Sequence, residues 1–153
     1  MISRKTKYGL QALLGLARDY GRGPILIADL AERERIPKKF LELILLELKN
    51  AGILGSRKGK GGGYFLAKDP AEITMGSAIR VLEGPLAPVA CVSETAYQKC
   101  DECHDEASCG IRLVMKEVRD AIADILDQTS VDDVLRRSRE ASQAARRVLD
   151  FSI

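Results

Sequence analysis

The chain has 153 residues, which is enough for one domain with an additional arm but too few for two full-sized domains. Hydrophobic residues make up 46% of the sequence and charged residues 30%, a composition that excludes a chain that stays disordered. With no Trp and only 3 Phe, the core must consist mainly of aliphatic side chains, and this favours a small helical protein.

The formal net charge of +2 conceals an uneven distribution of charge. Residues 1–60 contain 13 Lys and Arg against 6 Asp and Glu, whereas residues 71–110 contain 2 against 7. The N-terminal part is therefore suited to bind a polyanion, and the middle part is not. No apolar run reaches the roughly 18 residues of a membrane helix, and the N-terminus lacks the apolar stretch of a signal peptide. We expect a cytoplasmic protein without membrane contacts.

Two helices are predicted at the start of the chain. The first begins at a cap formed by Ser3 or Thr6 and continues to about Tyr20, with apolar side chains at helical spacing. The Gly-Arg-Gly-Pro sequence at residues 21–24 ends it. A brief second helix is expected over residues 27–35.

A third helix and a β-hairpin follow. Pro37 suits the first position of the third helix, whose apolar side chains share one face, and Gly52 suits its C-terminal cap. Residues 53–58 and 64–67 predict two short strands joined by a glycine-rich tip. Three helices followed by a hairpin predict a winged helix-turn-helix, in which the third helix is the recognition helix and the hairpin is the wing.

The rest of the chain predicts a mainly α fold around this small β wing. A short helix is expected over residues 75–82, a long helix over residues 111–128, and a polar C-terminal helix capped by Ser130 and Asp133. The chain thus divides into a winged helix-turn-helix DNA-binding domain, a cysteine loop, a dimerisation helix and a polar C-terminal helix or tail, at residues 1–82, 83–110, 111–128 and 129–153.

Basic residues gather in three of these predicted elements. Lys38 and Lys39 lie in the first turn of the recognition helix, where side chains reach base edges and phosphates. The helix dipole does not favour cations there, so an external anion would explain them, although a solvated helix end is the alternative. Glu42 could accept a hydrogen bond from a cytosine amino group, or could be a plain surface charge. The predicted DNA-binding residues are Arg4, Lys5, Lys7, Lys38, Lys39, Phe40, Glu42, Arg57, Lys58 and Lys60.

All four cysteines fall within one short segment, as Cys91, Cys100, Cys103 and Cys109. Four thiolates can complete a tetrahedral zinc site or hold an iron-sulfur cluster, and the Cys100-x-x-Cys103 spacing lets two sulfurs bind one centre. The acidic surroundings should raise the thiol pKa values, which argues against a reactive nucleophile. His104 is a possible additional ligand, but we expect a solvent-facing neighbour, because it follows Cys103 directly and four cysteines already suffice. A thiol-disulfide enzyme is the alternative from another class, but no thioredoxin-like βαβ pattern surrounds the pair.

The long helix carries an apolar stripe whose members advance by alternating steps of four and three residues. This spacing is typical of a coiled-coil seam and predicts a homodimer, although the stripe could instead cover its own domain. Its members are Ile111, Met115, Val118, Ile122 and Ile125.

Several of these segments resemble the Rrf-type (IscR-like) family of bacterial winged-helix transcription regulators. Residues 7–14 (KYGLQALL) resemble the family's first helix, and residues 36–42 (IPKKFLE) resemble the start of its recognition helix. Residues 56–67 resemble its wing, and the cysteines before a long helix resemble its sensor. The resemblance extends to about Val134.

The resemblance implies a homodimeric regulator rather than an enzyme. Family members bind double-stranded operator DNA, and many use a Cys-bound iron-sulfur cluster to sense iron, redox state or nitric oxide, while some work without metal. By position, Cys91, Cys103 and Cys109 match the usual three ligands, and Cys100 is the first candidate for the fourth. The expected cofactor is thus a 2Fe-2S or 4Fe-4S cluster that controls operator affinity as repressor or activator. The alternatives are a structural zinc and a metal-free thiol sensor.

Overall fold

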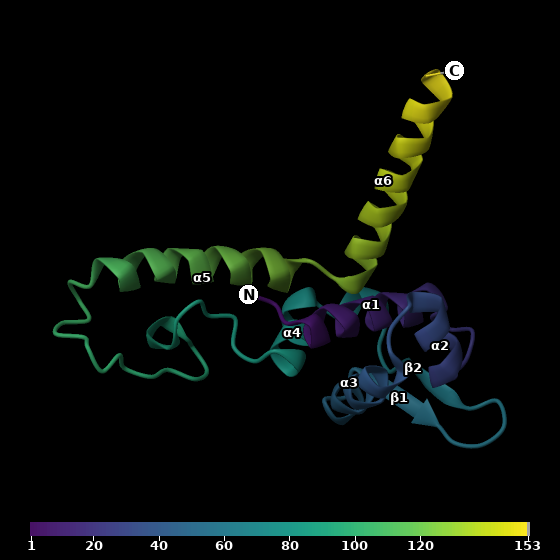
Figure 1. Cartoon of the computed structure of the whole chain (residues 1–153), viewed down its shortest axis with the longest axis horizontal. Helices are drawn as coiled ribbons and strands as arrows, with labels where there is room; N and C mark the ends of the chain where they lie inside the picture. Colours follow the sequence, from purple (N-terminus) through teal and green to yellow (C-terminus); the bar gives the residue numbers. More distant parts are fainter. Residues whose placement is uncertain (153) are drawn as a thin grey trace.

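In the computed structural model, which describes residues 1–152, the chain is mostly helical with one two-stranded hairpin, so the predicted fold class is confirmed (Figure 1). The elements are α1 (Arg4–Arg18), α2 (Ile27–Glu34), α3 (Lys38–Asn50), β1 (Leu54–Arg57), β2 (Gly63–Leu66), η1 (Pro70–Glu72), α4 (Met75–Leu82), η2 (Ala90–Val92), α5 (Gly110–Gln128) and α6 (Val131–Phe151). Ile153, at the end of the predicted C-terminal segment, lies outside the described residues. No helix within residues 1–152 is both long and apolar enough to cross a membrane.

The helix boundaries follow from local capping. At the start of α1 the Ser3 hydroxyl accepts a hydrogen bond from the Thr6 N–H at 3.2 Å, so Ser3 is the cap. The helix ends at Arg18, two residues before the predicted Tyr20. Pro37 is the N-cap of α3 rather than its first helical residue, because its ψ of 125° is extended.

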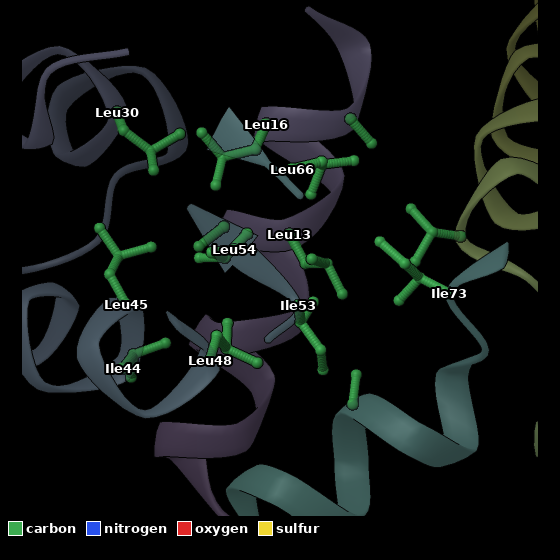
Figure 2. Close-up of a cluster of buried hydrophobic side chains, with 14 of the residues drawn as sticks. Leu13, Leu16, Leu30, Ile44, Leu45, Leu48, Ile53, Leu54, Leu66 and Ile73 are labelled. Carbon is green, nitrogen blue, oxygen red and sulfur yellow. The ribbon is translucent and has the colours of Figure 1, made fainter. Parts of the chain in front are cut away.

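The hydrophobic core lies between α1, α3 and the hairpin (Figure 2). The four core side chains of α3 recur at helical spacing and are completely buried, and they pack with equally buried leucines of α1 and α2. These fully buried residues include Leu13, Leu30, Leu41, Ile44, Leu45 and Leu48. Burying one face of α3 in this way leaves its opposite face free at the surface.

The hairpin is attached to the segment before α2. Leu54 pairs with Leu66, which places both side chains in the core. Tyr64 also pairs with Ile25: each residue donates its N–H to the other's carbonyl, at 2.8 and 2.9 Å. Gly63, at φ 141°, permits this approach, since a Cβ there would lie 2.2 Å from the Ile25 carbonyl oxygen. This pairing fastens the hairpin to the helical body through β2, close to the glycine-rich tip.

After α5 the chain returns to the core. The Met75 N–H donates to the Thr129 carbonyl and the Val131 N–H to the Ile73 carbonyl, both at 2.8 Å. Val131 is completely buried and Leu135 is buried beside it, so the first turns of α6 belong to the same core as α1 to α4. The rest of α6 projects away from this body, while α5 and the cysteine loop extend to one side (Figure 1).

The predicted cap of α6 is confirmed. The Ser130 hydroxyl accepts a hydrogen bond from the Asp133 N–H at 3.0 Å, and the Asp133 carboxylate accepts one from the Ser130 N–H at 2.9 Å. These bonds to Ser130, together with Arg136, lower the pKa of Asp133 to about 2.

Candidate DNA interface and cysteine pocket

The first turn of α3 presents its charged side chains to solvent. Lys38, Lys39 and Glu42 are all exposed, as the recognition-helix prediction requires. Phe40 is 48% exposed and its ring lies 6.0 Å from that of Tyr8 on α1, centroid to centroid. In the view of Figure 1, α3 and the hairpin lie on the side of the body away from α6.

Most of the predicted DNA-binding cations have no acidic partner. Within residues 1–152, no ion pair involves Arg4, Lys7, Lys38, Lys39, Arg57, Lys58 or Lys60. Lys5 differs, because its Nζ lies 2.8 Å from Glu47 Oε2 on α3. The fold thus offsets the charge of Lys5 and leaves the others available to an external anion.

A groove at the start of α1 adds a cation that the sequence patterns did not indicate. Arg35 lies with Arg4 and Lys7 along this groove, which has a volume of about 580 Å³. Arg35 ends α2 in the left-handed conformation at φ 54°, and an arginine at a helix C-cap carries no sequence signal for this position.

Glu83, after α4, holds the start of α1. Its carboxylate accepts hydrogen bonds from the Ser3 N–H at 2.9 Å and from the buried Thr6 hydroxyl at 2.5 Å. These bonds, Thr6 first, lower the pKa of Glu83 to about 2. The position of the first-turn cations of α1 therefore depends on the Glu83 carboxylate, which lies 77 residues beyond Thr6 in the sequence.

The stabilising effect of Glu83 should disappear in acid. A carboxylate whose pKa is lower in the folded chain stabilises the fold above its unfolded pKa, and this contribution is lost as the pH falls from about 4.5 to about 2. Thermal unfolding of the wild type and of Glu83→Gln should show a higher melting temperature for the wild type at pH 7 and equal values near pH 2. A constant difference across this range would contradict the role of the carboxylate.

The four cysteines line one pocket at the outer end of α5. The pocket has a volume of about 490 Å³ and is bordered by η2, the loop and the first residues of α5. Cys91, Cys103 and Cys109 are half-buried, whereas Cys100 is exposed. His104 is exposed and is not among the residues that border the pocket.

The thiols do not converge on one point in this conformation. Within residues 1–152, no three His, Cys, Asp or Glu side chains lie close enough together to hold a metal ion. The Cys100 Sγ donates to the Glu102 carboxylate at 3.0 Å, which raises the pKa of Cys100. Burial and the neighbouring Cys109 raise the pKa of Cys103. The direction of both shifts agrees with the expectation from the sequence that the thiol pKa values are raised. The donor set of thiols bordering one pocket fits a thiolate-bound metal group, and the loop would have to contract around it.

Two arginines of α5 hold the segment that carries Cys91. Arg112 Nε donates to the Cys91 carbonyl at 3.3 Å, and Arg119 Nη1 donates to the Val92 carbonyl at 2.8 Å. The two arginines are seven residues apart and so share a face of α5. Sequence reasoning missed Arg119, because only the folded loop places a carbonyl beside it.

The apolar stripe of α5 has some members that pack against the rest of the chain and others that are exposed to solvent. Met115 and Ile122 are half-buried against their own chain, whereas Ile111, Val118 and Ile125 are 71%, 39% and 64% exposed. Val114, at 54% exposed, lies on the same side. Next to this exposed stripe runs a groove of about 710 Å³ that is bordered by side chains such as Ile2, Ile79, Leu86, Val118 and Ile122. The helix thus covers its own domain and also presents an apolar face.

Known proteins share the sequence pattern and the fold of this chain. Residues 2–137 match the family model Rrf2, described as iron-dependent transcriptional regulator. The chain is similar to an rrf2-like HTH-type transcriptional regulator of Rhodobacter capsulatus, with 42% identity over 146 residues that cover 94% of this chain and 97% of the relative.

Two solved structures share the fold. CymR, the global cysteine regulator of B. subtilis, is 35% identical with a TM-score of 0.73, and the match covers 88% of this chain and 95% of CymR. IscR of T. potens is 33% identical with a TM-score of 0.72, and the match covers 92% of this chain and 90% of IscR.

Proposed function

The chain belongs to the Rrf2 family of DNA-binding transcriptional regulators, and on that premise we propose that it binds operator DNA as a homodimer whose affinity is set by an iron-sulfur cluster in the cysteine pocket. It is a regulator and not an enzyme. We propose that residues 1–82 bind DNA, with the first turns of α6 packed into their core, and that residues 83–128 carry the sensor and the dimer helix.

The single observation that carries the sensor proposal is the pocket at the start of α5, which all four cysteines border. Cys91, Cys103 and Cys109 would hold the cluster, with Cys100 as the fourth ligand. A bound cluster supplies a group that gains or loses electrons and that decays when iron is scarce or nitric oxide is present. The chain's own part is to transmit the shape of the loop to α5.

The two arginines of α5 support this transmission. Because Arg112 and Arg119 bind the carbonyls of Cys91 and Val92, a contraction of the loop would pull on the outer half of α5. The other end of α5 leads directly into Val131, which is buried in the DNA-binding core. Two arrangements of α5 with different affinity for DNA would make the device allosteric.

The homodimer proposal is supported by the exposed apolar stripe of α5. Ile111, Val118 and Ile125 repeat at heptad spacing on a helix of 19 residues, and a second copy of α5 could cover them. A dimer would also present two recognition helices, as paired operator half-sites require.

A metal-free thiol sensor is the second candidate function. It is favoured by the same conformation in which no three potential ligands within residues 1–152 converge on a metal position. A structural zinc would use the same thiols, without a redox response.

Anaerobic purification followed by an absorption spectrum and by iron, sulfide and zinc analysis separates these candidates. Iron with equimolar sulfide and a visible absorption band is expected. Stoichiometric zinc would indicate a structural zinc site instead of a cluster. A metal-free chain with full DNA affinity would favour the thiol sensor. The same samples should bind DNA differently with and without the cluster, and equal affinity would leave a DNA-binding protein without this sensor.

DNA binding itself should depend on salt through the unpaired cations. Each neutralised phosphate contributes about 0.9 to the slope of log affinity against log salt. Lys60→Ala should therefore lower the slope by about 0.9 per subunit, on specific and nonspecific duplexes alike. Lys116→Ala, which removes the same charge from α5, is the control and should leave the slope unchanged. Equal slopes for the wild type, Lys60→Ala and Lys116→Ala would show that Lys60 does not contact a DNA phosphate.

A further inference from the structure

The outward face of the recognition helix is more apolar than a solvated helix requires. Phe40, Leu43 and Leu46 are 48%, 61% and 47% exposed, and they follow one another at steps of three residues. The core does not use them, because the opposite face of α3 already supplies four completely buried side chains, Leu41, Ile44, Leu45 and Leu48. Adjacent exposed apolar side chains of this size mark a surface that contacts a partner.

The charges around this patch indicate what kind of partner covers it. Leu43 lies one helical turn after Lys39 and therefore on the same face of α3. Lys39 and the neighbouring Lys38 have no acidic partner within residues 1–152. An apolar protein surface pressed onto the patch would desolvate these cations without compensation, whereas phosphate groups beside an apolar contact would neutralise them.

Resting on the DNA-binding function, we propose that Leu43 reads the C5 methyl group of thymine in the major groove. Leucine has no hydrogen-bond donor or acceptor on its side chain, so it cannot recognise the polar edges of the bases. The apolar group that a base pair offers in the major groove is the thymine methyl. Phe40 inclines toward Tyr8 of α1, which leaves Leu43 as the most exposed apolar side chain of α3. Each operator half-site then carries a thymine that faces Leu43.

The test removes only the methyl group. The full-length chain selects duplexes from a random DNA library, and each thymine of the selected duplex is then replaced in turn by deoxyuridine. At one position in each half-site, the wild type should lose affinity by about fourfold per methyl group removed, which corresponds to about 0.8 kcal/mol. Leu43→Ala should bind the thymine and deoxyuridine duplexes equally.

Two further variants keep the comparison interpretable. Leu149→Ala removes an equally exposed leucine from α6, at 66% exposed, and should keep the wild-type preference for thymine. Leu43→Met keeps an apolar side chain at this position and should also keep the wild-type preference for thymine over deoxyuridine. Far-UV circular dichroism of Leu43→Ala should match the wild type, because Leu43 is exposed and alanine favours helix.

The outcomes separate this assignment from the DNA-binding function. Selected duplexes that tolerate deoxyuridine at every thymine would overturn the role of Leu43 while leaving DNA binding intact. A Leu43→Ala protein that still prefers thymine fourfold would do the same. Failure to enrich any duplex would overturn the DNA-binding function as applied to this chain, and with it the assignment.

Discussion

Val118→Glu should convert the proposed homodimer into monomers and sharply reduce its affinity for operator DNA. Val118 lies in the middle of the exposed stripe, between Ile111 and Ile125. In a twofold dimer the stripe meets its own copy, so the substitution buries two carboxylates without partners. Burying an ion in this way costs several kcal/mol, which is comparable with the free energy that holds a small interface together. Light scattering should report the mass of a single chain.

Leu113→Glu is the matched control for this change. Leu113 is also apolar and 49% exposed on α5, but five residues along a helix place its side chain about 140° away from that of Val118. The control should stay dimeric and bind DNA like the wild type. Circular dichroism should show both variants folded. A dimeric Val118→Glu beside a monomeric Leu113→Glu would place the interface on the other side of α5.

Cys103→Ala should abolish the proposed cluster, its absorption band and the response of DNA affinity to its loss. Cys103 is half-buried, and the pKa of its thiol responds, after burial itself, to the nearby Cys109. Cys103 borders the same pocket as the two other half-buried thiols, Cys91 and Cys109. An alanine there removes one of the three half-buried thiols that border the pocket. Anaerobic reconstitution followed by iron and sulfide analysis measures the loss.

Cys100→Ala should behave differently. Cys100 is exposed, and its thiol donates a hydrogen bond to the Glu102 carboxylate at 3.0 Å. In the Cys100→Ala variant, we expect this carboxylate to act as the fourth ligand in place of the thiolate. The cluster should still form, with shifted absorption and a shorter lifetime, because an oxygen donor gives less charge to iron than a thiolate does. An unchanged spectrum and lifetime would remove Cys100 from the ligand set, and complete loss of the cluster would make it equivalent to Cys103.

Local sequence patterns determined most of the secondary structure. The spacing of apolar residues predicted α1, α3 and α5, and capping residues predicted the starts of α1, as Ser3 or Thr6, and of α6, because these features depend on residues at most four positions apart. The glycine-rich tip predicted the hairpin for the same reason. The donor atoms of the candidate site were equally visible, since four cysteines and several clustered lysines are a matter of composition and spacing.

Only the tertiary structure decided how distant segments use these residues. It paired Lys5 with Glu47, brought Arg119 to the Val92 carbonyl, and placed Val131 in a core that the sequence suggested was complete by residue 82. It also turned part of the α5 stripe inward and left the rest exposed. Periodicity shows that a helix has an apolar face, but which neighbour covers that face depends on how the whole chain packs. The sequence therefore determined the elements and the chemistry they carry, and packing determined which side chains remain exposed at the proposed DNA interface, in the cysteine pocket and on the apolar face of α5.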